Sequence, residues 1–420
     1  MSPTPIWLEQ SFGGILAARI VLPFGSAADP SGQAGLHQLL AGSLTRGCGS
    51  LRAAEFAETI ESLGASLRSE ANDDRLVLAL KCVGSDAARL LPLLLEMVDN
   101  PLLDDSQVEL ERDLNLQTLQ RLQEDPFHLA HEGLRQLLYG RGGYSHDPLG
   151  CFNQLQILQP AVLQQRAQQL PCRDAVMVVH GPADSALQTE IHGRLKGWQQ
   201  PAHALPALLP QPDQPWRGIP VETEQTVLML GFRTVAIHHS DALALRLLQV
   251  HLGVGMSSRL FQSLRETHGL VYDVGAELAL RCLESPFIWH LSTAAEQAQA
   301  ALDALLQEWQ LLLDNALSES DLALARAKLR GQEALGRQTG AQRAERMALC
   351  LSLGLPADYH QQAIQAIDAI TPEAVQHAAQ RWLLEPSLCA CGPENSLKAL
   401  EEHWQHQRLR LIPSAAALPH

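Results

Sequence analysis

The same order of elements closes both halves of this chain. Residues 158–184 read LQPAVLQQRAQQLPCRDAVMVVHGPAD, and residues 370–395 read ITPEAVQHAAQRWLLEPSLCACGPEN. In each segment a proline stands just inside a helical stretch, which leads into a short apolar strand and a Gly-Pro turn. The two prolines lie 212 residues apart and the two Gly-Pro glycines lie 211 residues apart. The chain is therefore predicted to be a duplication of a unit of roughly 210 residues.

A proline-rich segment separates the two copies. Five prolines fall between Pro201 and Pro215. Proline breaks helices and cannot donate to a β-ladder, so these residues predict an extended linker over 201–217. We expect a first domain over 1–200, a second domain over 218–410 and a tail over 411–420.

Local patterns predict strands and helices in both copies. Apolar runs predict strands over 76–83 and 226–232. Helical spacing of apolar residues predicts helices over 52–64, 84–98, 104–123, 241–252, 297–314 and 319–338. Strands that alternate with pairs of helices indicate an α+β architecture.

Composition excludes several classes of protein. The net charge of −15 over 420 residues argues against a nucleic-acid binder. The sequence has no apolar run of about 18 residues and no basic start followed by an apolar core, so we expect no membrane span and a cytoplasmic location. The eight cysteines include no C-x-x-C pair, which favours reduced, mostly buried thiols. Alternation places Cys389 and Cys391 on one face of a strand.

The segment from Gly35 to Gly47 reads GLHQLLAGSLTRG. It resembles the frame G-L-x-H-x-x-E-H-x-x-x-x-G, which forms the first active-site helix in the M16 family of zinc peptidases (relatives of insulinase, pitrilysin and mitochondrial processing peptidase). In catalytic members the two His bind zinc and the Glu is the general base. Gln38, Ala41 and Gly42 stand at those three positions here.

The third zinc ligand of the family is a Glu in a helix that resembles E-R-x-x-x-x-x-E. Residues 111–118 read ERDLNLQT, so Thr118 stands at the ligand position, 76 residues after Gly42. Zinc in proteins is bound by imidazole, thiolate or carboxylate groups. The resemblance therefore implies a subunit with no zinc of its own and no peptidase activity alone.

A second motif is intact. Residues 251–272 read HLGVGMSSRLFQSLRETHGLVY and resemble the family segment G-x-G-x-S-S-R-L-F-x-x-L-R-E-x-x-G-L-x-Y. The Arg and Tyr of that segment match Arg265 and Tyr272, and the resemblance implies that both face a substrate held at a zinc site. Arginine can donate to peptide carbonyls, and a tyrosine hydroxyl can donate to a developing oxyanion. The alternative is a helix-capping Arg and a half-buried Tyr.

The same motif contains four small residues that the resemblance assigns to substrate binding. Gly253 and Gly255 form either a flexible glycine-rich loop that handles substrate or a simple helix C-cap. Ser257 and Ser258 are expected to cap a helix that starts at Arg259.

Three weaker signals lie outside these motifs. His128, His131 and Glu132 share one face of a helix, which is typical of a solvated surface and permits a metal site. His37 adjoins Gln38, but neighbours on a helix point about 100° apart, so His37 should not replace the missing ligand. Residues 63–68 stand where active relatives carry a substrate-pairing edge strand, and the Asn-Ala element of that strand is not recognisable here.

The M16 resemblance covers roughly residues 10–400. It implies two units, each an antiparallel sheet with helices packed on one face, that together form half of a clamshell. The expected function is the non-catalytic subunit of a heterodimeric zinc peptidase, with zinc in an M16-type partner and a peptide as substrate. Two alternatives are a homodimeric peptide-binding or structural scaffold and an active enzyme whose metal site has moved to His128 and His131.

Overall fold

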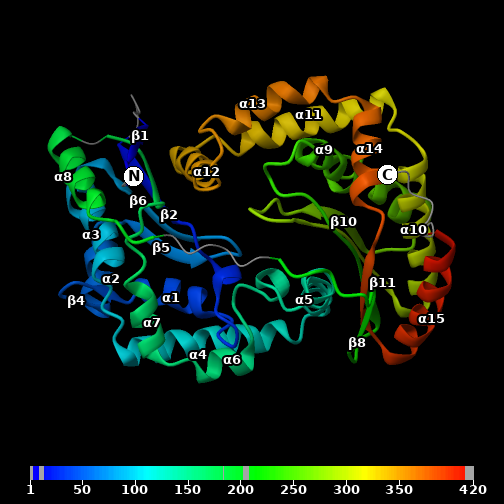
Figure 1. Cartoon of the computed structure of the whole chain (residues 1–420), viewed down its shortest axis with the longest axis horizontal. Coiled ribbons are helices and arrows are strands. Elements are labelled where there is room, and N and C mark those ends of the chain that lie inside the picture. The colour runs from blue at the N-terminus through cyan, green and yellow to red at the C-terminus, as the bar shows by residue number, and fades with distance from the viewer. Residues whose placement is uncertain (1–2, 9–13, 183, 202–207, 412–420) are drawn as a thin grey trace. The chain divides into compact units, whose positions relative to one another are not determined.

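The computed structural model describes residues 3–8, 14–182, 184–201 and 208–411 (Figure 1). Residues 202–207 of the predicted linker and residues 412–420 of the predicted tail lie outside the described residues. The chain divides into two compact units. The first comprises Met1–Arg121, His146–Ala207 and Ala334–Tyr359, and the second comprises Leu122–Ser145, Leu208–Glu333 and His360–His420.

A five-stranded sheet forms the centre of the first unit. Its strands, in spatial order, are β1 (Ile6–Leu8), β7 (Val176–His180), β2 (Ile15–Leu22), β6 (Leu76–Val83) and β5 (Ser66–Ala71). The pair β1–β7 is parallel and the other three pairs are antiparallel. In the register of the central strands, Ala18 lies opposite Val179 on one side and Leu80 on the other.

The second unit repeats this sheet strand for strand. Its spatial order is β8 (Trp216–Pro220), β12 (Ser387–Gly392), β9 (Gln225–Arg233), β11 (Pro286–Ala294) and β10 (Asp273–Leu278). Again the pair at one edge, β8–β12, is parallel and the remaining pairs are antiparallel. The repeated order and directions confirm the predicted duplication. They refine the expected antiparallel sheet by one parallel pair in each copy.

A layer of helices covers one face of each sheet, as expected. In the first unit these helices are α1 (Leu36–Leu44), α2 (Ala53–Glu61), α3 (Ala87–Asp99), α4 (Asp105–Leu122), α7 (Pro160–Ala167) and α8 (Ser185–Lys196). In the second unit they include α9 (Ala242–Gly253), α10 (Ala298–Asp314), α11 (Glu319–Leu335), α14 (Pro372–Trp382) and α15 (Glu394–Leu411). All the strands and helices predicted by residue range are confirmed, with ends that differ by a few residues.

One further helix covers the opposite face of each sheet. In the first unit this is α12 (Gly340–Ser352), whose Ala344 and Ala348 pack on Val21, Val77 and Val178 (Figure 1). In the second unit it is α5 (Pro126–Tyr139). Each unit thus takes this helix from the other half of the sequence. Because both faces are covered, β2 is buried along nearly its whole length.

The helix α5 approaches its sheet closely. A β-carbon placed at Gly133 would lie 2.6 Å from Cys389 Sγ, so the glycine permits the contact. Cys389 and Cys391 both lie on fully buried β12, with Ala390 in the core of the opposite face, which confirms the alternation predicted for this strand. Six of the eight cysteines are buried, which agrees with the prediction of mostly buried thiols.

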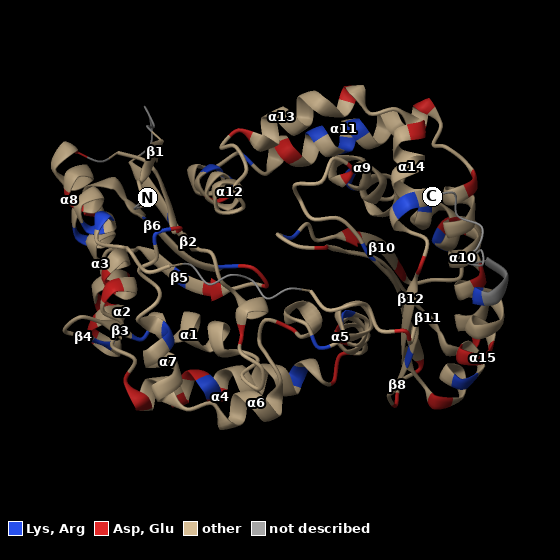
Figure 2. Ribbon diagram, in the orientation of Figure 1, with Lys and Arg blue, Asp and Glu red and all other residues tan. Residues whose placement is uncertain are grey.

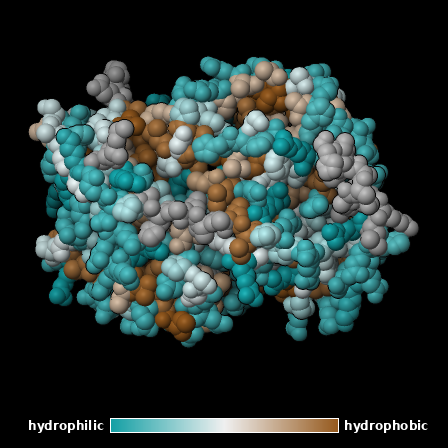
Figure 3. Space-filling view, viewed as in Figure 1, coloured by the Kyte–Doolittle hydropathy of each residue, from teal (hydrophilic) through white to brown (hydrophobic). Residues whose placement is uncertain are grey.

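The outer surface is mostly polar. Figure 2 shows acidic and basic residues interspersed along the outer helices, for example on α15. Figure 3 shows a largely hydrophilic visible face with scattered hydrophobic patches. Among the residues that the structure describes, no helix combines the length and the apolar character needed to cross a bilayer.

Candidate functional site

The helix α1 carries the first three positions of the metal frame, and a buried aspartate fixes its start. Gly35 precedes the helix with a φ of 100°, a left-handed conformation that favours glycine. The Asp29 carboxylate accepts hydrogen bonds from the Gly35 and His37 backbone N–H groups, at 2.7 and 3.1 Å. It also lies 2.6 Å from His37 Nδ1, and the His37 side chain is fully buried. His37 therefore serves the start of the helix, consistent with the prediction that it does not replace the missing ligand.

At three of the four metal positions the side chain is either hydrogen-bonded within the protein or packed in the core. Gln38 Oε1 accepts a hydrogen bond from the Ala71 backbone N–H at 2.8 Å, which ties α1 to the edge strand β5. Ala41 is fully buried in the core. The Thr118 hydroxyl donates to the Leu114 carbonyl of its own helix at 2.9 Å.

An ion pair occupies the space beside the fourth position, Gly42. Glu111 Oε2 lies 2.6 Å from Arg46 Nη2 and also accepts from Arg46 Nε at 3.1 Å. A β-carbon added at Gly42 would collide with the Glu111 carboxylate. Gly42 therefore lies against Glu111, which precedes the ligand position Thr118 on the same helix, and Arg46 neutralises this acid.

This set of groups does not fit zinc. The four positions offer an amide oxygen already in use, a methyl group, a hydrogen atom and a hydroxyl already donating, and none of these is an imidazole, thiolate or carboxylate. Across the described residues, no group of three or more His, Cys, Asp or Glu side chains could hold a metal. His128, His131 and Glu132 are partly exposed on α5, whereas the helix itself packs on the second sheet and Phe127 meets the His290 ring edge-on at 5.1 Å.

The segment that carries the second motif begins where α9 ends. Gly253 lies so close to Ala276 of β10 that a β-carbon would collide with the backbone there. Gly255 has a φ of 76°, the left-handed region, with open space around it. The two glycines therefore have different roles: one permits close packing and the other permits a turn.

Hydrogen bonds hold the turn after α9 in place. Lys328 Nζ donates to the Val254 carbonyl at 2.7 Å, and Gln262 Nε2 donates to the Met256 carbonyl at 2.6 Å. Ser258 is buried and Ser257 is exposed, and helical structure resumes at Arg259. This geometry is that of an anchored turn with an exposed tip.

Arg265 and Tyr272 lie in the part of the segment that follows. Arg265 belongs to a π-helical stretch, Phe261–Thr267, and its guanidinium carbon lies 5.1 Å from the centre of the Phe261 ring. Tyr272 directly precedes β10, and its backbone N–H donates to the Ser292 carbonyl at 2.8 Å. The Tyr272 side chain is 58% exposed. Among the described residues, neither side chain has a hydrogen-bond or ion-pair partner.

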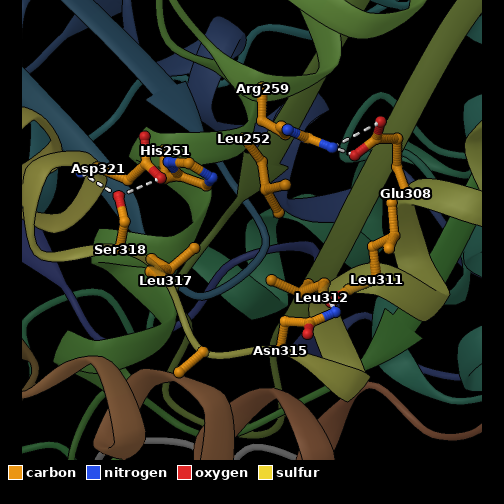
Figure 4. Close-up of a pocket in the computed structure, with 11 residues that line it drawn as sticks. His251, Leu252, Arg259, Glu308, Leu311, Leu312, Asn315, Leu317, Ser318 and Asp321 are labelled. Carbon is orange, nitrogen blue, oxygen red and sulfur yellow. Dashed lines mark hydrogen bonds and ion pairs between the residues drawn. The ribbon is translucent and has the colours of Figure 1, made fainter.

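A cavity of about 200 Å³ lies behind this turn, between α9, α10 and the start of α11 (Figure 4). On one side, Arg259 and buried Glu308 form a two-point ion pair, with Nε–Oε2 at 2.6 Å and Nη2–Oε1 at 3.2 Å. On the other side, His251 faces Asp321, whose carboxylate accepts from Ser318 Oγ at 2.6 Å. Burial lowers the pKa of His251, although the charge of Asp321 acts in the opposite direction.

Sequence reasoning did not identify the residues that anchor this segment. Glu308 and Lys328 bond Arg259 and the Val254 carbonyl, from which they lie 49 and 74 residues away in the sequence. For Glu308 a signal was present, because it is a single acid within the apolar stripe of α10, next to Trp309. A charged residue at such a position indicates a buried partner.

Two family models match the chain. The model described as "Insulinase (Peptidase family M16)" matches residues 8–146, and the model described as "Peptidase M16 inactive domain" matches residues 173–329. Curated relatives include an uncharacterized zinc protease of Mycobacterium tuberculosis, which is 23% identical over 90% of this chain and 88% of the relative. The uncharacterized zinc protease YmxG of Bacillus subtilis is 22% identical over 71% of this chain and 73% of the relative.

Solved structures share the fold of the whole chain. The "peptidase M16 inactive domain" from Pseudomonas fluorescens superposes with a TM-score of 0.84 at 21% identity, over 93% of this chain and 96% of that chain. A protease from Helicobacter pylori superposes with a TM-score of 0.81 at 18% identity, over the same shares of the two chains. Together with the two consecutive family models and the repeated sheet, these matches show that the chain belongs to the M16 family of insulinase-type peptidases.

Proposed function

We propose that this chain is the non-catalytic subunit of a two-chain M16-type zinc peptidase. A zinc-bearing homologue would supply the metal and the general base, and this chain would supply Arg265 and Tyr272. One observation supports this proposal above the others: the metal positions and the Arg265–Tyr272 pair differ in whether their side chains are already engaged within the protein. The metal positions are filled by packing and internal bonds, whereas Arg265 and Tyr272 are exposed and have no bonding partner among the described residues.

The two side chains suit the chemistry of peptide hydrolysis. A zinc ion in the partner's site would supply an activated water and polarise the scissile carbonyl. The Arg265 guanidinium can hold the carbonyl groups of an extended peptide, because its planar fork presents several donors at once. The Tyr272 hydroxyl can donate to the oxyanion that forms when water attacks. A tyrosine that is not already bonded meets this requirement without breaking an existing contact.

The anchored turn would position these groups. Gly253 and Ser258 are packed or buried, so we assign them to holding the segment against β10 and α9. Gly255 and Ser257 lie at the exposed tip, so we assign them to contact with the peptide backbone. The hydrogen bonds from Lys328 and Gln262 then limit the motion of the tip, which lowers the entropy cost of ordering it on a peptide.

The test is reconstitution with a zinc-bearing M16 homologue from the same organism. Cleavage of a quenched peptide library is measured for each chain alone and for the mixture. We expect cleavage from the mixture only. In the complex, Arg265→Ala should lower kcat/KM by roughly 100-fold, and Tyr272→Phe by roughly 10- to 100-fold, since removal of one oxyanion donor typically costs that much or more. Co-migration of the two chains on gel filtration should be unchanged.

Matched controls separate catalysis from folding. Arg381 also lies over an aromatic ring of its own helix, at 5.2 Å from the Trp382 ring centre, so Arg381→Ala removes the same kind of contact elsewhere in the unit. Tyr359→Phe removes a hydroxyl outside the segment. Both controls should leave turnover unchanged. A homologue that is fully active alone and unaffected by mixing would refute the shared site, and a stable homodimer of this chain would then favour a peptide-binding scaffold.

A further inference from the structure

A second cavity lies in the first unit, beside the start of α1. It has a volume of about 280 Å³ and is bounded by the residues just before α1 and by α7. The helices α1 and α7 contact each other (Figure 1). Its lining includes Pro30, Gln33, Leu36, Val162, Gln165 and Arg166. Leu36 belongs to the metal frame but not to its ligand positions, and the other residues lie outside both the frame and the Arg265 segment, so the cavity has no role in the function proposed above.

The charged group of this cavity is a buried arginine with few partners. Arg166 is only 9% exposed, yet among the described residues its guanidinium makes a single hydrogen bond, from Nη1 to Gln169 Oε1 at 2.9 Å. No carboxylate among the described residues comes within ion-pairing distance of it. Burial lowers the pKa of Arg166, and the charge of Asp29 acts in the opposite direction.

Another arginine of the same unit shows what a compensated guanidinium looks like. Arg194 bonds two carboxylates, Asp99 at 2.5 Å and Glu96 at 2.8 Å, and a backbone carbonyl at 2.9 Å. The charge of Asp29 raises the pKa of Arg166, but no ion pair joins these two residues. The oxygens of Asp29 are already occupied by His37 and by the backbone at the start of α1. A buried cation in this state lacks a counter-charge.

We propose that this cavity binds the oxyanion group, a carboxylate or a phosphate, of a small metabolite. The guanidinium fork matches both groups and can bind either through two parallel hydrogen bonds. The side-chain amides of Gln33 and Gln165 have no hydrogen bonds within the described structure and can supply further donors. Leu36, Val162 and Pro30 provide an apolar wall for a short carbon skeleton. The volume lies at the small end of the range for ligand sites.

The test compares anions on the full-length chain. Thermal unfolding and isothermal titration calorimetry are carried out with sodium succinate, sodium phosphate and, as a reference, sodium chloride at matched ionic strength. We expect a saturable rise in Tm and measurable heat with succinate, phosphate or both, and neither with chloride. Saturation by succinate alone would identify carboxylates as the ligand class, and saturation by phosphate alone would identify phosphate compounds.

Three variants connect the binding to Arg166. Arg166→Gln should abolish the anion-dependent rise in Tm, and Arg166→Lys should weaken binding by about tenfold because the charge remains while the fork is lost. Gln165→Ala, at an exposed position that should not affect folding, should weaken binding several-fold. As a control, Arg173→Gln removes a surface charge nearby and should bind like the wild type, since the Arg173 side chain is half exposed.

Stability without anion gives a second, independent readout. Removal of a poorly compensated buried charge should leave the Tm of Arg166→Gln equal to that of the wild type or above it. Three results would overturn the proposal: no saturable effect of either anion, an equal effect on the wild type and on Arg166→Gln, or a large drop in Tm of Arg166→Gln without anion. The last would show that the guanidinium has a structural role. None of these measurements depends on a zinc-bearing partner.

Discussion

The α1–α4 region of the first unit and the α9–η4 region of the second (η4 being the π-helical stretch Phe261–Thr267) occupy corresponding places in a repeated fold. In each copy the first helix of the region, α1 or α9, follows the second strand of its sheet and covers the same face. In the first region the polar groups are satisfied internally, by pairs such as Arg46–Glu111 and Gln38–Ala71. In the second region the turn after α9 is held by internal hydrogen bonds, but Arg265 and Tyr272 at the surface have no hydrogen-bond or ion-pair partner in the described structure.

This difference shows how a protein interior accommodates a missing metal. Buried polar groups must be paired, so the acid that remains on α4 is neutralised by Arg46 and the space at Gly42 is filled by the same carboxylate. No such pressure acts on an exposed side chain, which water can satisfy. The exposure of Arg265 and Tyr272 is compatible both with simple hydration and with the substrate role proposed for them, and the variants of these two residues distinguish the two cases.

The largest expected effect comes from a variant that makes the first region resemble a catalytic one. Gln38→His, Ala41→Glu, Gly42→His and Thr118→Glu together should create a zinc site. The imidazole introduced by Gly42→His must displace Glu111 from Arg46, at a cost of about 1–3 kcal/mol, whereas structural zinc sites contribute about 10 kcal/mol or more. Metal analysis should find close to one zinc per variant chain after dialysis. Absence of bound zinc at micromolar concentrations would mean that α1 and α4 no longer present these positions in ligand geometry.

A matched pair of glycines compares the packing of the two regions. Gly253→Ala places a methyl group against the backbone of β10, which cannot move easily, and should lower the free energy of unfolding by about 2–3 kcal/mol. Gly42→Ala meets only the end of the Glu111 side chain, which can rotate away, and should cost less than about 1 kcal/mol, because alanine favours the helix. Urea unfolding of both variants measures the difference. Equal losses would contradict this account of the two contacts.

Variants that remove one charge should show, by their effect on the free energy of unfolding, which charged residue has a structural role. Glu111→Gln leaves Arg46 without its counter-charge in a half-buried place and should lower the free energy of unfolding by about 1–2 kcal/mol. Arg265→Met should change it by less than about 0.5 kcal/mol, since the residue is exposed and makes no ion pair. Chemical denaturation of the single variants measures both values. If Arg265→Met proved the more destabilising change, Arg265 would have a structural role.

The smallest expected effect is a pH dependence that arises mainly in the second unit. Burial lowers the pKa of His251 and His290 there, and of His180 in the first unit. Below the unfolded value of about 6.5, the unfolded chain binds more protons than the folded chain, so stability falls as pH decreases through that range. The urea midpoint should therefore drop between about pH 7.5 and about pH 5.5, on either side of that unfolded value. His251→Gln should flatten this dependence, and the exposed control His406→Gln should not.

Much of the fold followed from local patterns. The duplicated helix–strand segment, the strands over 76–83 and 226–232 and the long helices were all predicted from periodicity and from proline and glycine positions. The absence of zinc ligands at Gln38, Ala41, Gly42 and Thr118 was also a local property, because the type of residue at each position decides it. The packing of α5 on the second sheet was not predicted, because its covered face contacts strands that lie far away in the sequence.

The sequence by itself determined two similar units, the elements within each and the chemical groups missing from the metal frame. Only the tertiary structure decided that α5 and α12 cover the sheets of units built mainly from the other half of the chain, that Arg46 neutralises Glu111 and that Arg166 has no carboxylate partner among the described residues. The physical reason is range. Helix and strand periodicity arises from neighbours a few residues apart, whereas charge compensation and face-to-face packing depend on residues that only folding brings together.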